Sequence, residues 1–448
     1  MNFDAPSLST PMQQRRFDAA PPGVTIEYLP PVRDVAPEWA SGVPAFVGYA
    51  RVDEALFERP GSRAVVLDRW DDKLWGSAIA PAEGSYLRPA VFGFFANGGS
   101  RCVLFTAPDD EPSDAQALMR LLAPGGPMED RSDIDLVCVP DASCPWIEPN
   151  ERLALMADVL RHCEFAGDRF ALLDAPPPGQ SDTPMDLVAM WTRTASRLRS
   201  RYGALYGPWV TPDPTRDDAL AHDAVPKRNG VVAYDAVPTA WRLLDTGRDP
   251  LAMATASTVP ACGHVAGLIA RLDRRYGPQQ APGNESLDGV LDQALPLSAS
   301  QLGKLNEAGV NCIHSVRGRG ICVGGARTLS SQAQWAHISS ARVVLSFRRW
   351  LARGMGDLAF EPQSNALWDT IRSRLVSHCL DMQQAGALVG DQPGEGFFVK
   401  CDAETNPPEE RYLGHVVAHI GLAPSVPAEY ILVRVIQDAS GFTVSGLS

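Results

Sequence analysis

The stretch Asn311–Ser330, NCIHSVRGRGICVGGARTLS, is the most informative part of this chain. It places glycines between short β-type runs and arginines beside them: Gly318, Gly320, Gly324 and Gly325, with Arg317, Arg319 and Arg327. A glycine-rich turn ahead of a helical pattern suggests nucleotide binding, but Gly324 comes one residue too late for a dinucleotide fingerprint. No Gly-x4-Gly-Lys-Ser/Thr string of a phosphate-binding loop occurs either. The segment therefore predicts strands of a structural domain.

The composition is that of an ordinary globular protein. The chain has 448 residues, which predicts two or three domains, and 45% of them are hydrophobic. Its formal net charge of −13 argues against a nucleic-acid or anionic-membrane surface, which needs a basic field. No apolar run reaches the roughly eighteen residues of a membrane span, and no signal peptide is apparent. The nine scattered cysteines predict buried, reduced thiols in a cytoplasmic protein.

Strand and helix patterns alternate between about residues 90 and 210. The apolar runs RCVLF (101–105), DLVCVP (135–140) and RFALLDAP (169–176) each precede an amphipathic helical stretch. Such alternation predicts a parallel sheet that is covered by helices on both faces.

The pattern changes after residue 300. The predicted elements there are a helix at 299–308, strands within 311–324, helices near 332–353 and 364–386, a strand at 397–402, and a hairpin of 412–422 with 430–437. We expect an α/β protein (α+β overall), multi-domain, with a parallel α/β domain and a C-terminal α+β domain. The predicted boundaries are 1–22 for an N-terminal arm, 23–90 for an N-terminal strand and outer segment, 91–298 for the α/β domain, 299–438 for the C-terminal domain and 439–448 for a C-terminal arm.

Both ends of the chain carry a short predicted strand beside a polar segment. GVTIEYL (23–29) alternates apolar and polar residues between proline pairs, and Phe442–Val444 alternates in the same way near the C-terminus. An isolated strand is not stable alone. Each must therefore pair with a distant part of the chain or with another chain.

Few side chains suggest chemistry. His415 and His419 lie four apart, but their context is strand-like and no third metal ligand is indicated, so two half-buried strand histidines are expected. His264 is expected to be a cap or core histidine at a helix start. No catalytic, cofactor or metal site is predicted, and the chain is not expected to be an enzyme.

One basic feature stands out on this acidic chain. Arg342, Arg348, Arg349 and Arg353 follow one predicted helix and form a basic stripe. Such a stripe predicts contact with an acidic partner, and ordinary solvated arginines are the equally weighted alternative.

Phrases along most of the chain resemble contractile tail sheath proteins, the family of phage tails, R-type pyocins and extracellular contractile injection systems. The phrases are VFGFFANGGSRCVLF (91–105), RFALLDAP (169–176), ALYGPWV (204–210), VPACGHVAGLIARLDRRYGPQQAPGN (259–284), LNEAGVNCI (305–313), GRGICVGGARTL (318–329), FEPQSNALW (360–368), FFVKCDAETN (397–406) and GLAPSVPAEYILVRV (421–435). They occur in the family's order. Residues 31–90 match only loosely, which leaves the subfamily and the outer domain open.

This resemblance implies a mechanical subunit that polymerises as stacked hexameric rings around an inner tube and contracts to drive the tube through a target envelope. The implied partners are further copies of the chain, the inner tube protein, and baseplate and terminal cap proteins, without nucleic acid or direct membrane insertion. Assembly is expected in the cytoplasm, and the product is a phage tail or a related particle.

The resemblance also implies roles for particular residues. Terminal arms of sheath subunits donate strands to neighbours, which points to Gly23, Val24, Thr25, Ile26, Glu27, Tyr28 and Leu29, and to Phe442, Thr443 and Val444. The acceptor hairpin is expected at Tyr412, His415, Val417, His419, Tyr430, Leu432, Arg434 and Ile436. Candidates for a tube-facing surface are Arg342, Arg348, Arg349 and Arg353.

Two other classes stay open at this point. An α/β enzyme is suggested by the alternation within 101–210, although no motif supplies a polar site. A monomeric binding module is the second alternative, and particle size separates it from a sheath.

Overall fold

The computed structural model describes residues 41–446 of the chain apart from several short and one long gap. The gaps are 60–61, 108–114, 130, 180–181, 214–257, 359–360, 391, 393, 426–430 and 439–440. All described residues belong to one unit, residues 36–448. The predicted strand Gly23–Leu29 and Tyr430 lie outside the described residues.

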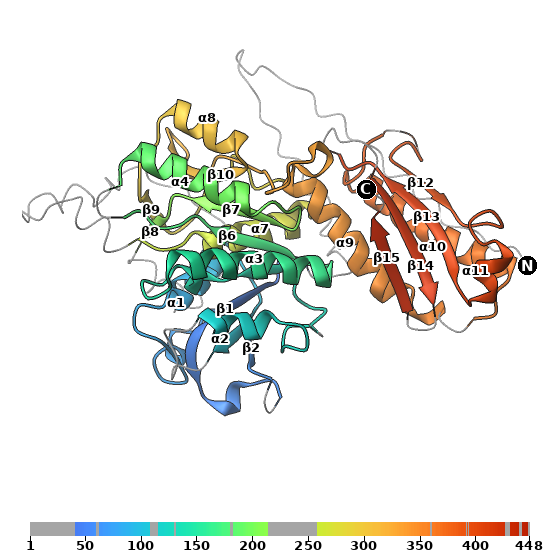
Figure 1. Cartoon of the computed structure of the whole chain (residues 1–448), viewed down its shortest axis with the longest axis horizontal. Helices are drawn as coiled ribbons and strands as arrows, with labels where there is room; N and C mark the ends of the chain where they lie inside the picture. Colours follow the sequence, from blue (N-terminus) through green and yellow to red (C-terminus); the bar gives the residue numbers. More distant parts are fainter. Residues whose placement is uncertain are drawn as a thin grey trace, which may run out of the picture. The chain divides into compact units, whose positions relative to one another are not determined.

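A nine-stranded, mostly parallel sheet forms the first part of this unit (Figure 1). Its order is β11-β10-β7-β6-β5-β1-β4-β2, with β3 paired to β1. The strands are β1 (Pro44–Val52), β2 (Ala64–Leu67), β3 (Ile79–Pro81), β4 (Cys102–Ala107), β5 (Leu136–Cys138), β6 (Phe170–Asp174), β7 (Gly203–Gly207), β10 (Val310–Val316) and β11 (Gly320–Val323). Only β2, β3 and β11 run antiparallel to their neighbours.

Helices cover both faces of this sheet, as the sequence predicts. Helices α1 (Leu87–Ala96) and α7 (Cys262–Tyr276) pack together on one face. The other face carries α2 (Ala115–Leu122), α3 (Pro149–Ala166), α4 (Pro184–Arg197) and α8 (Ala299–Glu307). The chain leaves β1 for β4 in one direction and returns from β4 to β5 in the other, so right-handed crossovers place α1 and α2 on opposite faces.

Local signals in the sequence start these helices. Thr183 accepts a hydrogen bond from the Asp186 amide, and the Asp186 side chain accepts one from the Thr183 amide, which makes a capping box ahead of α4. Ser298 and Gln301 do the same for α8. Helix α3 ends at Gly167, whose φ of 66° is in the left-handed region that favours glycine.

The Asn311–Ser330 stretch forms an antiparallel hairpin of β10 and β11 at the edge of the sheet. Gly318 and Gly320 have φ values of 79° and 83°, so the turn needs glycine for its backbone geometry. The predicted strands are confirmed. The sheet also takes β1 and β10 from beyond the predicted boundaries at 90/91 and 298/299, so it does not follow those divisions.

A second, antiparallel sheet has the order β12-β13-β14-β15 (Figure 1). Its strands are β12 (Phe397–Lys400), β13 (Val416–Leu422), β14 (Ile431–Asp438) and β15 (Gly441–Gly446), and α9 (Ile338–Gly354), α10 (Asn365–Gln384) and α11 (Pro408–Tyr412) precede or interrupt them. Val416, Ala418, Ile420 and Leu422 point to one face of β13 and join the hydrophobic core. A small ribbon of β8 (Val210–Pro212) and β9 (Val290–Gln293) completes the described strands.

Candidate functional site

The C-terminal sheet contains the hairpin predicted to accept strands. Strands β13 and β14 pair in the register Val417↔Ile436 and His419↔Arg434, so the predicted hairpin exists. The predicted strand start is wrong, because Tyr412 ends helix α11 and β13 begins only at Val416. The proline pair at 407–408 begins that short helix, and Gly414, with φ 79°, follows it.

The predicted C-terminal strand also forms, and it pairs within its own chain. Residues 441–446 run antiparallel to β14, with Val444 opposite Val435 and Thr443 opposite Ile436. In the single chain, β15 therefore covers the β14 edge that a neighbour's strand was expected to cover. Donation to another copy remains a proposal.

Exposed apolar side chains lie around this sheet. Phe398 on the edge strand β12 is 44% exposed, and its ring lies over Gly421 of β13. Tyr412 and Leu413, at the end of α11, are 92% and 64% exposed. Large apolar side chains in the open are typical of contact surfaces when they gather near one another.

The two hairpin histidines do not form a metal site. The His415 ring contacts Glu410 through Nδ1 and Oε2 at 3.0 Å, and His419 sits within β13, opposite Lys400 of β12. Among the residues that the structure describes, no group of three or more His, Cys, Asp or Glu side chains could hold a metal ion.

The proposed basic stripe on α9 is wrong for two of its four arginines. Arg342 and Arg349 are only 3% and 6% exposed, so neither can face a partner. Arg342 forms a two-pronged ion pair with Asp273 of α7, with Nη1 2.8 Å from Oδ1, and it also contacts Asp135 at 3.3 Å. Arg349 lies 3.5 Å from Asp135 and donates to the Asp168 carbonyl.

The charges of this buried cluster balance. Burial alone would raise the pKa of Asp135, but Arg349, Arg342 and two backbone amides outweigh it and lower the pKa. Burial alone would lower the pKa of Arg342, and its two aspartates reverse that effect and raise it. Each ion keeps its charge because the others are present.

Arg348 and Arg353 are half-buried, and a role at a partner surface stays a prediction for both. The Arg348 guanidinium lies beside Gly167 at the end of α3. Arg353 donates to the carbonyl of Ser132.

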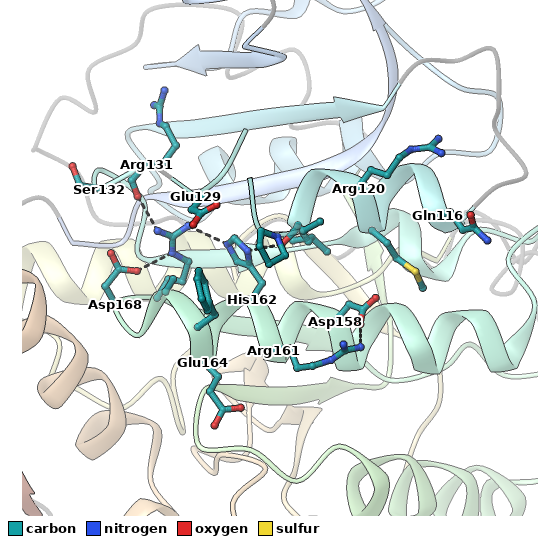
Figure 2. Close-up of a pocket in the computed structure, with 17 residues that line it drawn as sticks. Gln116, Arg120, Glu129, Arg131, Ser132, Asp158, Arg161, His162, Glu164 and Asp168 are labelled. Carbon is teal, nitrogen blue, oxygen red and sulfur yellow. Dashed lines mark hydrogen bonds and ion pairs between the residues drawn. The ribbon is translucent and has the colours of Figure 1, made fainter. Parts of the chain in front are cut away.

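A pocket of about 1030 Å³ lies between α2 and α3 (Figure 2). At its base, the buried Arg169 donates to the carbonyls of Met128 and Arg131 and to Nε2 of His162, at 2.9, 2.9 and 3.1 Å. Because arginine only donates, Nε2 accepts, and Nδ1 of His162 donates to the Leu122 carbonyl at 2.8 Å. Burial and then Arg169 lower the pKa of His162, so the ring is neutral and both nitrogens are occupied. This histidine is not placed to act as a base.

Asparagines in three of the sequence segments that resemble tail sheath proteins have structural roles. Asn97, Asn311 and Asn406 are fully buried. Each uses its side-chain amide like a peptide group: Asn406 accepts from the Val417 amide at 2.6 Å and donates to the Val417 carbonyl at 3.0 Å. Asn97 pairs in the same way with Asp288, and Asn311 with Arg327. These residues fix segments distant in the sequence to α1, β10 and β13.

Two further phrases meet at the start of α7. The carboxylate of Asp174, at the end of β6, accepts a hydrogen bond from the Cys262 amide at 2.9 Å, where the helix dipole favours a negative charge. Burial nevertheless raises the pKa of Asp174 to about 6. His264, in the first turn of the helix, is a fully buried core residue, and burial lowers its pKa to about 4.

Residues 134–329 match the phage tail sheath protein central domain. A protein of Pseudomonas aeruginosa (strain UCBPP-PA14), named as a prophage major tail sheath protein, is 26% identical over 192 residues, which are 40% of this chain and 46% of that protein. The tail sheath protein of Burkholderia phage BcepMu is 28% identical over 182 residues, 38% of this chain and 36% of that protein. The matched region thus spans less than half of either relative.

Solved structures are similar over a longer range. A chain of the anti-feeding prophage (AFP) baseplate has a TM-score of 0.63 at 22% identity, over 92% of this chain and 98% of that chain. A chain of the PVC sheath complex, an extracellular contractile injection system in the contracted state, has a TM-score of 0.60 at 20% identity, over 92% and 96%. The fold is therefore similar over 92% of this chain. Residues 134–329 thus resemble the central domain of phage tail sheath proteins, and the fold is similar to that of a chain in a contractile particle.

Proposed function

We propose that this chain is the structural subunit of a contractile sheath, which polymerises as stacked hexameric rings around an inner tube and contracts to drive the tube through a target envelope. The observation that carries this proposal is the similarity in fold to a chain of the AFP baseplate, because it covers 98% of that chain as well as 92% of this one. Similarity confined to a single domain would also fit a protein with a different overall architecture.

The proposal extends to partners and location. The chain would bind further copies of itself, the inner tube, and baseplate and terminal cap proteins. The similar structures are a baseplate and a sheath complex, which supports contacts with further copies of the chain and with baseplate proteins. Assembly would take place in the cytoplasm, and the product would be a phage tail or a particle derived from one. No helix in the described ranges is long and apolar enough to cross a membrane.

The polar chemistry of the described residues supports a mechanical role over an enzymatic one. The pocket between α2 and α3 holds a neutral histidine whose two nitrogens are both engaged. The buried arginines and aspartates of the cluster on α9 neutralise one another. These ion pairs hold α7, α9 and the loop before β5 together.

The terminal strands would link the subunits by exchange. The β14 edge that β15 covers in one chain is the edge that residues 441–446 of a second copy would cover in the polymer, in the same register from Asp438↔Gly441 to Val433↔Gly446. Each backbone hydrogen bond contributes only about 1 kcal/mol, but the link repeats through the lattice. Residues 23–29 would add to the other edge of this sheet in a neighbour, beside β12.

Truncation tests the proposal. Full-length chain, a variant lacking residues 1–22 and a variant lacking residues 439–448 are purified and compared by negative-stain electron microscopy, with circular dichroism as the check on folding. We expect tubes of stacked rings from the full-length chain only, and folded but dispersed protein from both truncations.

Two results would oppose the proposal. Intact tubes from either truncated variant would refute the assignment of that arm as a strand donor. Full-length protein that stays monomeric at high concentration, also with the inner tube protein present, would favour the alternative of a monomeric binding module or an enzyme.

A further inference from the structure

The buried ionic cluster lies beside the first described residues of the chain. Ser41 is the first described residue, and its hydroxyl lies 2.6 Å from Oδ2 of Asp273. The amides of Gly42 and Val43 donate to the two oxygens of Asp135 at 3.0 and 2.6 Å. Residues 41–43 are therefore held by both aspartates just before β1, a strand in the middle of the large sheet.

The same two aspartates hold α9. Arg342 contacts Asp273 and Asp135, and Arg349 contacts Asp135. Asp135 and Asp273 are each 2% exposed, so water does not screen these interactions. A change at either arginine would therefore affect residues 41–43 through Asp135, the carboxylate that both arginines contact.

The backbone at Gly42 also packs directly against α7. Gly42 has a φ of 78°, and a side chain there would overlap Ala270 of α7. The chain thus passes directly over α7 between Ser41 and Val43, with no room for a side chain. Three separate elements, α7, α9 and the loop before β5, meet at this one point.

We propose that Asp135, Asp273, Arg342 and Arg349 form an anchor that fixes residues 41–43 and couples their position to α9. A pull or displacement on the N-terminal segment then acts on α7 and α9 together, and a displacement of α9 acts on the start of β1. The anchor is a property of the single chain, and only its use, the transfer of force from an exchanged N-terminal arm, rests on the proposed function.

Hydrogen exchange measured by mass spectrometry on the dispersed full-length chain tests the coupling. The probes are peptides that begin before residue 40 and extend past residue 43, because the first two residues of a peptide lose their label. Peptides from β13 serve as the internal check on folding. Arg342→Lys keeps the charge and removes the two-pronged contact with Asp273. We expect it to accelerate exchange at residues 42–43 by about tenfold, although Arg342 makes no hydrogen bond to either amide. Ser41→Ala, a mild change in a half-buried residue, should accelerate exchange in the same peptides.

The double variant decides between coupling and coincidence. Ser41 and Arg342 both contact Asp273 and Asp135, and Nη2 of Arg342 lies 3.5 Å from the Ser41 hydroxyl. If the anchor couples them, Ser41→Ala combined with Arg342→Lys accelerates exchange clearly less than the product of the two single effects. Arg152→Lys is the matched control, because Arg152 is also buried in the same unit but donates to the carbonyls of Ala142 and Ile147, outside the cluster. Its effect should multiply with that of Ser41→Ala.

Two outcomes would overturn the anchor. One is unchanged exchange at residues 42–43 in Arg342→Lys while α9 itself exchanges faster. The other is a double variant whose effect equals the product of the single effects. Neither outcome bears on sheath assembly, since the measurement needs no polymer.

Discussion

Gly263 and Gly267 lie one helical turn apart on α7, at the crossing with α1. A Cβ on Gly263 would overlap the carbonyl of Ala90, and one on Gly267 would overlap the carbonyl of Phe94. Gly93 of α1 in turn leaves room for the ring of the buried His264. The phrase CGHVAG thus serves close helix packing. A sequence shows such spacing, but it does not name the partner helix.

Replacement of Gly263 tests this contact. Gly263→Ala should lower the free energy of unfolding by about 1–3 kcal/mol, because main chain cannot move aside as a flexible side chain can. Gly303 in α8 is the matched control, since nothing lies within 4 Å of a Cβ built there. Gly303→Ala should stabilise the protein by roughly 0.5–1 kcal/mol, as alanine favours a helix. Urea unfolding of both variants checks the prediction, and equal effects would contradict it.

Asp174 gives a pH-dependent test. Its pKa is about 6 in the folded state because of burial, above the usual value near 4 for the unfolded chain. Between these values the folded state binds more protons, so stability falls as pH rises from about 4 to 6 and stays lower above that window. The loss amounts to about 3 kcal/mol at most.

Asp174→Asn should remove this component. The asparagine keeps an oxygen that can accept from the Cys262 amide and has no charge to bury. Urea unfolding at several pH values should show that the free energy of unfolding of the variant rises relative to that of the natural chain as the pH increases from 4 to 6. Parallel pH profiles for the two proteins would show that Asp174 stays ionised in the folded state throughout.

At the scale of elements, the sequence predicted what depends on local pattern. The alternation of apolar strands and amphipathic helices gave the parallel sheet and its two helical layers, and the glycines of 318–320 gave the β10–β11 turn. The local pattern did not predict the contacts of Arg342, because its partners Asp135 and Asp273 lie 207 and 69 residues away along the chain. An arginine on a helix looks solvated until the opposing element is known.

Asn406 shows how one side chain fixes an element. It bonds both backbone groups of Val417 and the carbonyl of Asp402, so it holds the loop before α11 against β13. Asn406→Ala leaves a buried amide and carbonyl unpaired and should cost roughly 2–4 kcal/mol. Hydrogen exchange should rise in β13 while β6 is unaffected.

Asn365 supplies the control for this change. It is exposed at the first turn of α10, and Asn365→Ala should alter stability by less than about 0.5 kcal/mol. Equal exchange in β13 for both variants would mean that the Asn406 bonds do not hold this strand.

At the scale of the whole molecule, the C-terminal strand has two ways to pair. In the single chain β15 closes onto its own β14, which leaves the sheet edge covered before assembly. In the proposed sheath the same residues pair with another copy in the same register. No sequence pattern can separate these two states, because they make identical strand contacts and differ only in which chain supplies them.

A disulfide placed across this strand pair distinguishes the two states in assembled particles. Val435 and Val444 are directly opposite, and cysteines at such antiparallel positions are close enough to join. The control pair, Ala418 with Val435, joins β13 to β14 within one chain. After oxidation and denaturing electrophoresis without reductant, Val435→Cys/Val444→Cys should give a ladder of covalent multimers, and the control pair only monomers. Monomers alone from the first pair, in particles that are seen to be intact tubes, would contradict strand exchange between subunits.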